Sequence, residues 1–182
     1  MEENYGTKES RSNKKAASGR GLAHELKALM LKCAVVTVAL IILLGYIFGM
    51  TRNLSLNMQP SFQDGDLVFY YRIVQGYAAD DVVVIHHKNQ ALLERIAAVS
   101  GDTVDITEDG LMINGSLVQE QHAFGETTQF EEGVTFPLTV PAGKVFLLGD
   151  NRPHATDSRI FGCVDVHDID GRVIGIFRRR NF

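Results

Sequence analysis

Residues 54–72 decide the fold, and they read LSLNMQPSFQDGDLVFYYR. The alternation of apolar and polar residues over 54–57 predicts a short strand, which ends before Pro60 because proline cannot donate to a sheet ladder. A turn is expected at Gln63–Asp66, and the aromatic and branched residues of Leu67–Tyr71 predict a second strand. Together these pieces would place the small side chain of Asn57 at the lip of a cleft.

From Leu67 onward the sequence has the pattern of an all-β domain. Short runs of apolar and branched residues recur roughly every ten residues, as in barrel-like or sandwich domains. Asn114-Gly115 predicts a tight hairpin turn, and the polar stretch Gln119–Glu132 predicts a loop. The expected strands are Leu67–Tyr71, Val82–His86, Ala91–Val99, Thr103–Ile106, Leu111–Ile113, Ser116–Val118, Pro137–Val140, Lys144–Leu148 and Arg172–Phe177. The predicted fold class is therefore mainly β, with one N-terminal transmembrane helix.

The N-terminal part predicts a membrane anchor. Residues 1–28 are mostly polar, so disorder is expected there. Residues 29–50 are apolar apart from Lys32 and reach the ~20 residues that cross ~30 Å of hydrocarbon. A cleavable signal peptide is the alternative, but the apolar run is longer than the ~7–15 residues of a signal core, and no small-x-small cleavage motif follows it. Residues 51–182 would form the folded domain.

Charged residues set the expected orientation and exclude one class of partner. Seven basic residues lie at or before Lys32, whereas Arg52 stands nearly alone after the span, and this bias places the N-terminus in the cytoplasm. The part after the span holds 11 basic and 18 acidic residues, a net charge of −7, so nucleic acid is not an expected partner. Cys33 lies in the span and leaves only Cys163, which excludes an internal disulfide framework.

The segment Asn57–Phe62 followed by Asp64-Gly65-Asp66 resembles the nucleophile segment of bacterial type I signal peptidases. In that family the residue before the methionine is the catalytic serine, and in this chain it is Asn57. The family's general base is a lysine in a Lys-Arg pair, and in the matching segment, residues 93–102, Glu94 takes its place. The resemblance covers roughly Lys32 to Phe182. It implies a signal-peptidase-like β domain whose groove accepts an extended peptide by strand addition.

These two substitutions remove the chemistry of the family. A neutral lysine deprotonates the serine in a signal peptidase. The Asn57 amide has no hydroxyl to attack a carbonyl, and a carboxylate with a reference pKa near ~4.3 is a poor base for a serine proton. We predict that the Asn57 amide donates to Glu94, directly or through water, in the space of the lost contact.

Residues 149–159 are similar to a second family motif, Gly-Asp-Asn-Arg…Asp-Ser-Arg. Ala155 stands where some members carry a hydroxyl residue that orients the lysine. Gly149 permits a tight turn, and the charged residues are expected to form a network that fixes this loop behind the cleft. The residues given a structural role are Pro60, Gly149, Asp150, Asn151, Arg152, Ala155, Asp157, Ser158 and Arg159.

Ser55 and Met58 are the expected cleft residues beside Asn57. Ser55 matches a hydroxyl that helps line the oxyanion hole in some family members, because side chains two residues apart on a strand share one face. As a replacement nucleophile, Ser55 would be displaced by ~6.6 Å, and a misplacement of ~1 Å already costs catalysis heavily. Ser61 lies beyond Pro60 and has no evident base, so neither serine is expected to restore activity.

Two histidines invite a metal hypothesis. His86 and His87 are adjacent on a predicted strand and point to opposite faces, so they cannot share one metal. No other cluster of residues implies a metal or a cofactor. The terminal arginines 178–180 are expected to be solvated.

Aromatic and apolar residues near the site receive two different expectations. Phe69 and Tyr71 are expected to fill the β core. Signal peptidases have an apolar surface that rests in the bilayer near the cleft, and Met58 and Phe62 are the candidates for it here.

Two functions stay open from the sequence. The first is a catalytically silent signal-peptidase-like protein on the outer face of a bacterial membrane, which binds a secreted protein or pilin subunit as an assembly factor or chaperone. It would be similar to dyad-less members associated with pilus gene clusters of Gram-positive bacteria. The second is an active type I signal peptidase, a serine endopeptidase that processes preproteins by a rerouted mechanism. The expected partners are the lipid bilayer and an extended peptide, without a cofactor.

Overall fold

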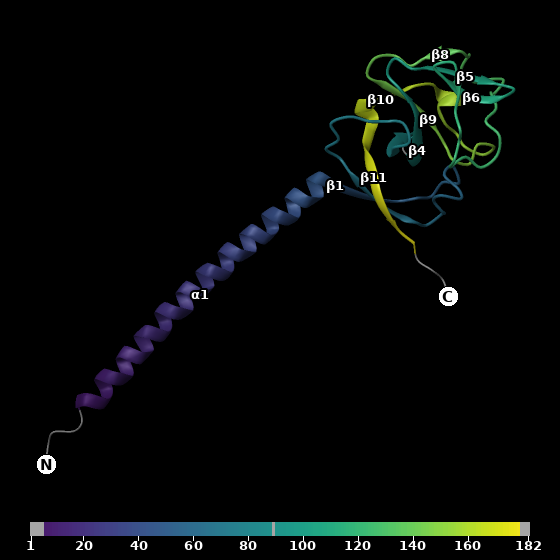
Figure 1. The fold of residues 1–182 in the computed structure, drawn as a ribbon. Coiled ribbons are helices and arrows are strands. Elements are labelled where there is room, and N and C mark those ends of the chain that lie inside the picture. Colours follow the sequence, from purple (N-terminus) through teal and green to yellow (C-terminus); the bar gives the residue numbers. More distant parts are fainter. Residues whose placement is uncertain (1–5, 89, 179–182) are drawn as a thin grey trace. The chain divides into compact units, whose positions relative to one another are not determined.

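A computed structural model describes residues 6–88 and 90–178, and side chains from residue 25 onward. The chain divides into two compact units, Met1–Gly45 and Tyr46–Phe182. Helix α1, Gly6–Ile47, forms the first unit and enters the second, which is built mainly of strands (Figure 1).

The helical unit agrees with a membrane anchor. Glu25–Ile47 has a mean hydropathy of 2.5 and is long enough to cross a membrane, and none of it is buried by described protein. Its apolar side chains therefore need another apolar environment, which a bilayer supplies.

The ends of α1 correct two expectations. The sequence predicts disorder over residues 1–28, but the helix begins at Gly6, so residues 6–28 are helical. Lys, Arg, Glu and Ala dominate that stretch and favour helix, and a helix already formed over the apolar span extends without a new nucleus. At the other end, α1 stops at Ile47, and Phe48–Met50 belong to a strand instead of the predicted span.

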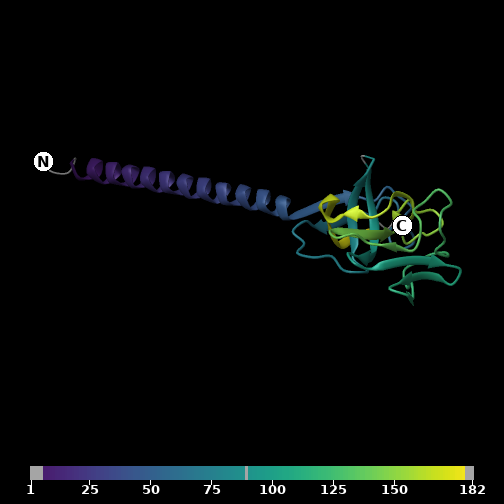
Figure 2. The ribbon, with the colours of Figure 1, turned by 90° about the horizontal axis from the view of Figure 1, so that it is seen from above.

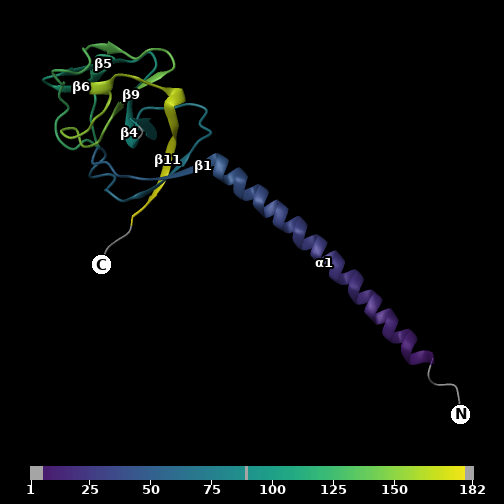
Figure 3. The ribbon, with the colours of Figure 1, turned by 180° about the vertical axis from the view of Figure 1, so that it is seen from behind.

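The β unit contains two antiparallel sheets. The larger sheet is curled and has the order β1-β2-β11-β3-β4-β9-β10, and the smaller has the order β7-β6-β5-β8. In all three views the smaller sheet lies at the end of the β unit away from β1 (Figure 1, Figure 2 and Figure 3). The strands are β1 Phe48–Arg52, β2 Leu67–Tyr71, β3 Val82–His87, β4 Gln90–Val99, β5 Thr103–Thr107, β6 Gly110–Ile113, β7 Ser116–Leu117, β8 Leu138–Thr139, β9 Lys144–Leu148, β10 Val164–Asp165 and β11 Ile169–Phe177.

The mainly β fold class is confirmed, and so are most of the strands. β2 and β9 have the predicted bounds, and the predicted hairpin turn has positive φ at both Asn114 and Gly115, as a two-residue hairpin requires. The sequence did not indicate β1, β10, the short helix α2 (Ser158–Phe161) or the 3-10 turn Val166–Asp168. The strand expected over residues 54–57 is wrong, because residues 53–66 contain no strand.

The phase of β2 also differs from the expectation. Val68 and Tyr70 are buried, whereas Phe69 is 39% exposed and Tyr71 is half-buried. Five consecutive apolar residues carry no alternation, so the sequence does not reveal which face is inside. The pairing of β2 with β1 determines which face is buried, because Gly49 on β1 leaves the space into which the Tyr70 ring packs.

Met58 and Phe62 lie in the core and not on the surface. They pack with Val68 and Leu93 in a buried cluster, and Met58 is fully buried. The expectation that these two side chains rest in the bilayer is therefore wrong. The neighbouring Leu54 and Leu56 are the exposed apolar residues of this segment.

Candidate functional site

The loop of residues 53–66 carries Asn57 and is closed at its base. The Asn53 amide donates to Asp66 O at 2.9 Å, and the Gly65 amide donates to Asn53 O at 2.8 Å. Arg178 donates to both carboxylate oxygens of Asp66, at distances from 2.7 to 3.1 Å. Arg178 thus holds this loop in place and is not a freely solvated tail residue. Its hydrogen bonds to the Asp66 carboxylate hold the pKa of Asp66 below its usual range.

Asn57 and Glu94 meet as predicted. Asn57 Nδ2 donates to Glu94 Oε1 at 2.6 Å and to Thr156 O at 3.3 Å. Ser55 Oγ accepts a hydrogen bond from the backbone N–H of Asn57 at 3.1 Å. Ser55 therefore caps a turn and does not share a strand face with Asn57. The side-chain amide of Asn57 and one oxygen of the Glu94 carboxyl group are therefore paired in a buried contact.

Glu94 is a buried acid with only one satisfied oxygen. The residue is fully buried, and Oε2 has no hydrogen-bond partner among the described residues. Burial raises the pKa of Glu94 well above its ordinary value, and the nearby Asp157 carboxylate raises it further, while the Asn57 amide acts in the opposite direction. Glu94 therefore keeps its proton to a higher pH than a solvated glutamate.

This pKa shift predicts a specific pH dependence of stability. Unfolded Glu94 loses its proton near pH 4.5 and the folded residue loses it later, so its contribution is fully present below pH 4.5 and is lost as the pH rises through the folded pKa. Glu94→Gln keeps an oxygen for Asn57 but cannot ionise. We expect the variant to gain stability relative to the native protein by up to about 1.4 kcal/mol per pH unit on going from about pH 5 to pH 8.

Urea unfolding of both proteins across this pH range measures the difference. Asp66 also makes the free energy of unfolding depend on pH, but it does so equally in both proteins and cancels in their difference. Parallel stability curves would show that Glu94 is already ionised in the folded protein, which contradicts the prediction.

The second motif packs directly on this contact. The Asn151 amide donates to Asn57 O at 2.7 Å, and Asn151 Nδ2 donates to Leu56 O at 3.0 Å. Gly149 lies between Ala155 and Glu94, since a Cβ built on it would be 2.4 Å from Ala155 Cβ and 3.3 Å from Glu94 Oε2. The glycine is needed for this close approach and not for a positive φ, which it does not adopt.

The expected charged network exists, but two of its partners come from elsewhere. Asp157 pairs with Arg159, with neither side chain exposed. Asp150 accepts from Arg95 Nε and Nη2, both at 2.8 Å, and Arg152 bonds to Glu120 and Thr127. Arg95 could have been found, because it follows Glu94 on β4 and must point to the other face. Glu120 lies in the polar 119–132 loop, and no local pattern marks it.

The other predicted motif residues have structural contacts. Ser158 Oγ accepts from the Leu147 amide at 2.9 Å, and Met58 Sδ lies 3.4 Å from the Asp150 amide. Pro60 lies in the same turn as Asn57. Ser61 contributes its carbonyl to Arg178 at 3.1 Å. The described contacts therefore give the two alternative serines no base.

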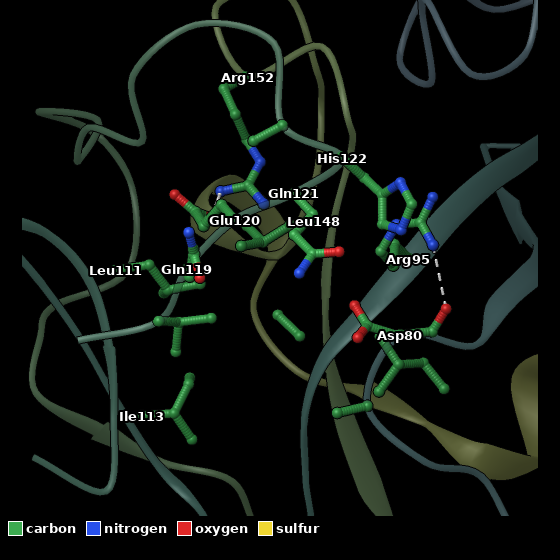
Figure 4. A pocket seen from close by; sticks show the side chains of 15 residues that line it. Asp80, Arg95, Leu111, Ile113, Gln119, Glu120, Gln121, His122, Leu148 and Arg152 are labelled. Atoms are coloured by element: carbon green, nitrogen blue, oxygen red, sulfur yellow. Dashed lines mark hydrogen bonds and ion pairs between the residues drawn. The ribbon is translucent and has the colours of Figure 1, made fainter. Parts of the chain in front are cut away.

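A hollow of about 290 Å³ is lined in part by Arg152 of this motif. Figure 4 shows the Arg152 and Glu120 side chains together above the hollow, with Arg95 and Asp80 beside it. Arg152 Nε donates to Gly149 O at 2.9 Å, so one arginine connects the hollow to Gly149, the glycine that lies against Glu94. The 119–132 loop is thereby fixed to the site.

The described residues contain no group of three or more His, Cys, Asp or Glu that could hold a metal. His86 pairs with Asp170 through Nδ1 at 2.8 Å, while the His87 ring stacks on Phe161. The two histidines thus have separate partners.

Known proteins resemble the chain over most of its length. Residues 26–178 match the family model described as signal peptidase, peptidase S26. Signal peptidase I of Bacillus licheniformis is 32% identical over 154 residues, which cover 77% of this chain and 82% of that protein. Signal peptidase IB of Staphylococcus aureus is 30% identical over 168 residues, 82% of this chain and 87% of the relative. A crystal structure of a signal peptidase I from Enterococcus faecalis is 30% identical, covers 56% of this chain and 99% of that chain, and has a TM-score of 0.48.

Proposed function

The chain belongs to the peptidase S26 family of signal peptidases, and we propose that it binds an extended segment of a secreted protein or pilin subunit without cleaving it. In this proposal it acts as an assembly factor or chaperone on the outer face of a bacterial membrane. The N-terminus lies in the cytoplasm, and α1 anchors the β unit.

The Asn57–Glu94 contact is the observation that carries the proposal. By resemblance, these residues occupy the positions of the family's serine and lysine. Asn57 Nδ2 donates to Glu94 Oε1 at 2.6 Å, with Glu94 fully buried and Asn57 6% exposed. An amide cannot attack a carbonyl, and the carboxyl group of Glu94 accepts a hydrogen bond from that amide and not from a hydroxyl nucleophile. This geometry supports a site without catalysis.

A free strand edge beside this contact supports peptide binding. β3 pairs with β4 over residues 90–95, whereas β9 pairs with β4 only from Arg95 to Val99. Within the described chain, residues 90–94 therefore have no strand on their second edge. An extended segment can add there through main-chain hydrogen bonds, next to Glu94.

An apolar surface on the β unit supports contact with the bilayer. Phe48, Met50 and Phe69 are exposed on β1 and β2, and Ile174 and Phe177 are exposed on β11, which pairs with β2. A surface of exposed apolar residues on adjacent strands is typical of a membrane or protein contact. These residues replace Met58 and Phe62 as the side chains that would rest in the bilayer.

The test is a binding and cleavage assay with full-length protein in nanodiscs. The ligand is a preprotein segment with alanine at the two small-residue positions before the cut. We expect saturable binding, with the segment intact by mass spectrometry after incubation that lets a control signal peptidase cleave it. A segment N-methylated at alternate residues should bind at least about tenfold more weakly, because it cannot form the main-chain ladder.

Cleavage would overturn the proposal if Asn57→Ala or Ser55→Ala abolished it. That result would establish the active peptidase instead. Equal binding of the native and N-methylated segments would remove strand addition from the proposal.

A further inference from the structure

A second hollow of the β unit is lined by basic residues. Its volume is about 520 Å³, and Arg72, Lys144 and His167 line it. Its apolar lining includes Tyr77, Val145 and Ile169. No carboxylate lines this hollow among the described residues, although residues 51–182 carry a net charge of −7.

We call this hollow, lined by Arg72, Lys144 and His167, the basic hollow. The described residues form six ion pairs, and none of these pairs includes one of the three basic residues. The Arg72 guanidinium lies 5.5 Å from the centre of the Tyr70 ring. Asp165 is opposite Lys144 in the β9–β10 pair, but its carboxylate accepts from the His167 amide. Unpaired arginine and lysine therefore leave a local positive potential in an acidic domain.

A backbone hydrogen bond connects Arg72 to the last residue of α1. The Arg72 amide donates to Ile47 O at 2.9 Å, and both residues belong to the β unit. Ile47 is the last residue of α1, whose segment Glu25–Ile47 is long enough to cross a membrane. If the anchor ends at the edge of the hydrocarbon, Arg72 lies at the level of the lipid headgroups.

We propose that the basic hollow binds the phosphate group of an anionic phospholipid headgroup. Arg72 and Lys144 supply charge-assisted donors to the phosphate oxygens. The apolar lining accepts the carbon atoms that follow the phosphate. The inference rests on the membrane anchor and does not depend on whether the protein cleaves a peptide.

Native mass spectrometry of the full-length protein in detergent tests the site. Phosphatidylglycerol, phosphatidylcholine and inorganic phosphate are titrated separately, and inorganic phosphate is also used as a competitor. We expect phosphatidylglycerol to bind tightest. Arg72→Gln and Lys144→Gln should each weaken its binding roughly fivefold, and the double variant should weaken it about 25-fold.

Two matched variants distinguish a built site from diffuse attraction. Arg52→Gln removes an exposed arginine that also follows the anchor, and Lys88→Gln removes an exposed lysine at a hairpin tip; neither lines the hollow. Both should leave phosphatidylglycerol binding unchanged. The proposal is overturned by equal binding of the two lipids, by a loss with Arg52→Gln as large as with Arg72→Gln, or by full competition from inorganic phosphate at concentrations equal to the lipid.

Discussion

Replacing Arg159 with methionine should lower the free energy of unfolding by about 3–5 kcal/mol, because it leaves a buried carboxylate without its counter-ion. Neither Arg159 nor Asp157 is exposed. Arg159 Nε and Nη2 donate to the two oxygens of Asp157 at 2.9 and 2.8 Å, and Nη2 also donates to Arg152 O at 2.7 Å. The substitution would therefore break the connection between two parts of the second motif as well as the ion pair.

Urea unfolding of the full-length protein in a mild detergent measures this effect, and Arg172→Met is the matched control. Arg172 pairs with Asp81 at 3.4 Å with side-chain exposures of 42% and 20%, so its loss should cost less than about 1 kcal/mol. If the two variants lost the same stability, the Asp157–Arg159 pair would have to be accessible to water in the folded protein.

The contact at the centre of the site could be predicted because it depends on chemical complementarity. The family resemblance places Asn57 and Glu94 in contact, and an amide and an acid in contact form a hydrogen bond. The conformation around Asn57 could not be predicted. Four alternating residues are too few to separate a strand from a loop, and the loop is closed by Asp66, which Arg178 holds from 112 positions away.

In the second motif, too, local contacts could be predicted from the sequence and long-range contacts could not. Its aspartates and arginines are close in sequence and suggest pairing among themselves, yet Asp150 pairs with Arg95 and Arg152 pairs with Glu120. Only the Asp157–Arg159 pair is local, and it is held by the first turn of α2, where Asp157 also accepts from the Arg159 amide. Long-range partners depend on the register of β4 and on the course of the 119–132 loop, which no local pattern contains.

Gly149→Ala should be the second large effect, with a loss of about 3 kcal/mol from overpacking. Its Cβ would lie 2.4 Å from Ala155 Cβ and 2.7 Å from Asn57 O, and the second neighbour is backbone that cannot rotate away. Gly175→Ala is the matched control, because a Cβ there would meet nothing within 4 Å and its φ is not positive. That control should change the free energy of unfolding by less than about 0.5 kcal/mol.

The double variant Gly149→Ala/Ala155→Gly separates the two clashes. Removing the Ala155 methyl relieves the contact at 2.4 Å but leaves the one with Asn57 O, so stability should return only in part. The new methyl also lies against Glu94 Oε2 and the Asn57 backbone. The double variant should therefore change the surroundings of the Glu94 carboxyl group, and with them the pH dependence of stability that Glu94 causes. A double variant with native stability and native pH dependence would mean that Gly149 does not form the wall of the Asn57–Glu94 site.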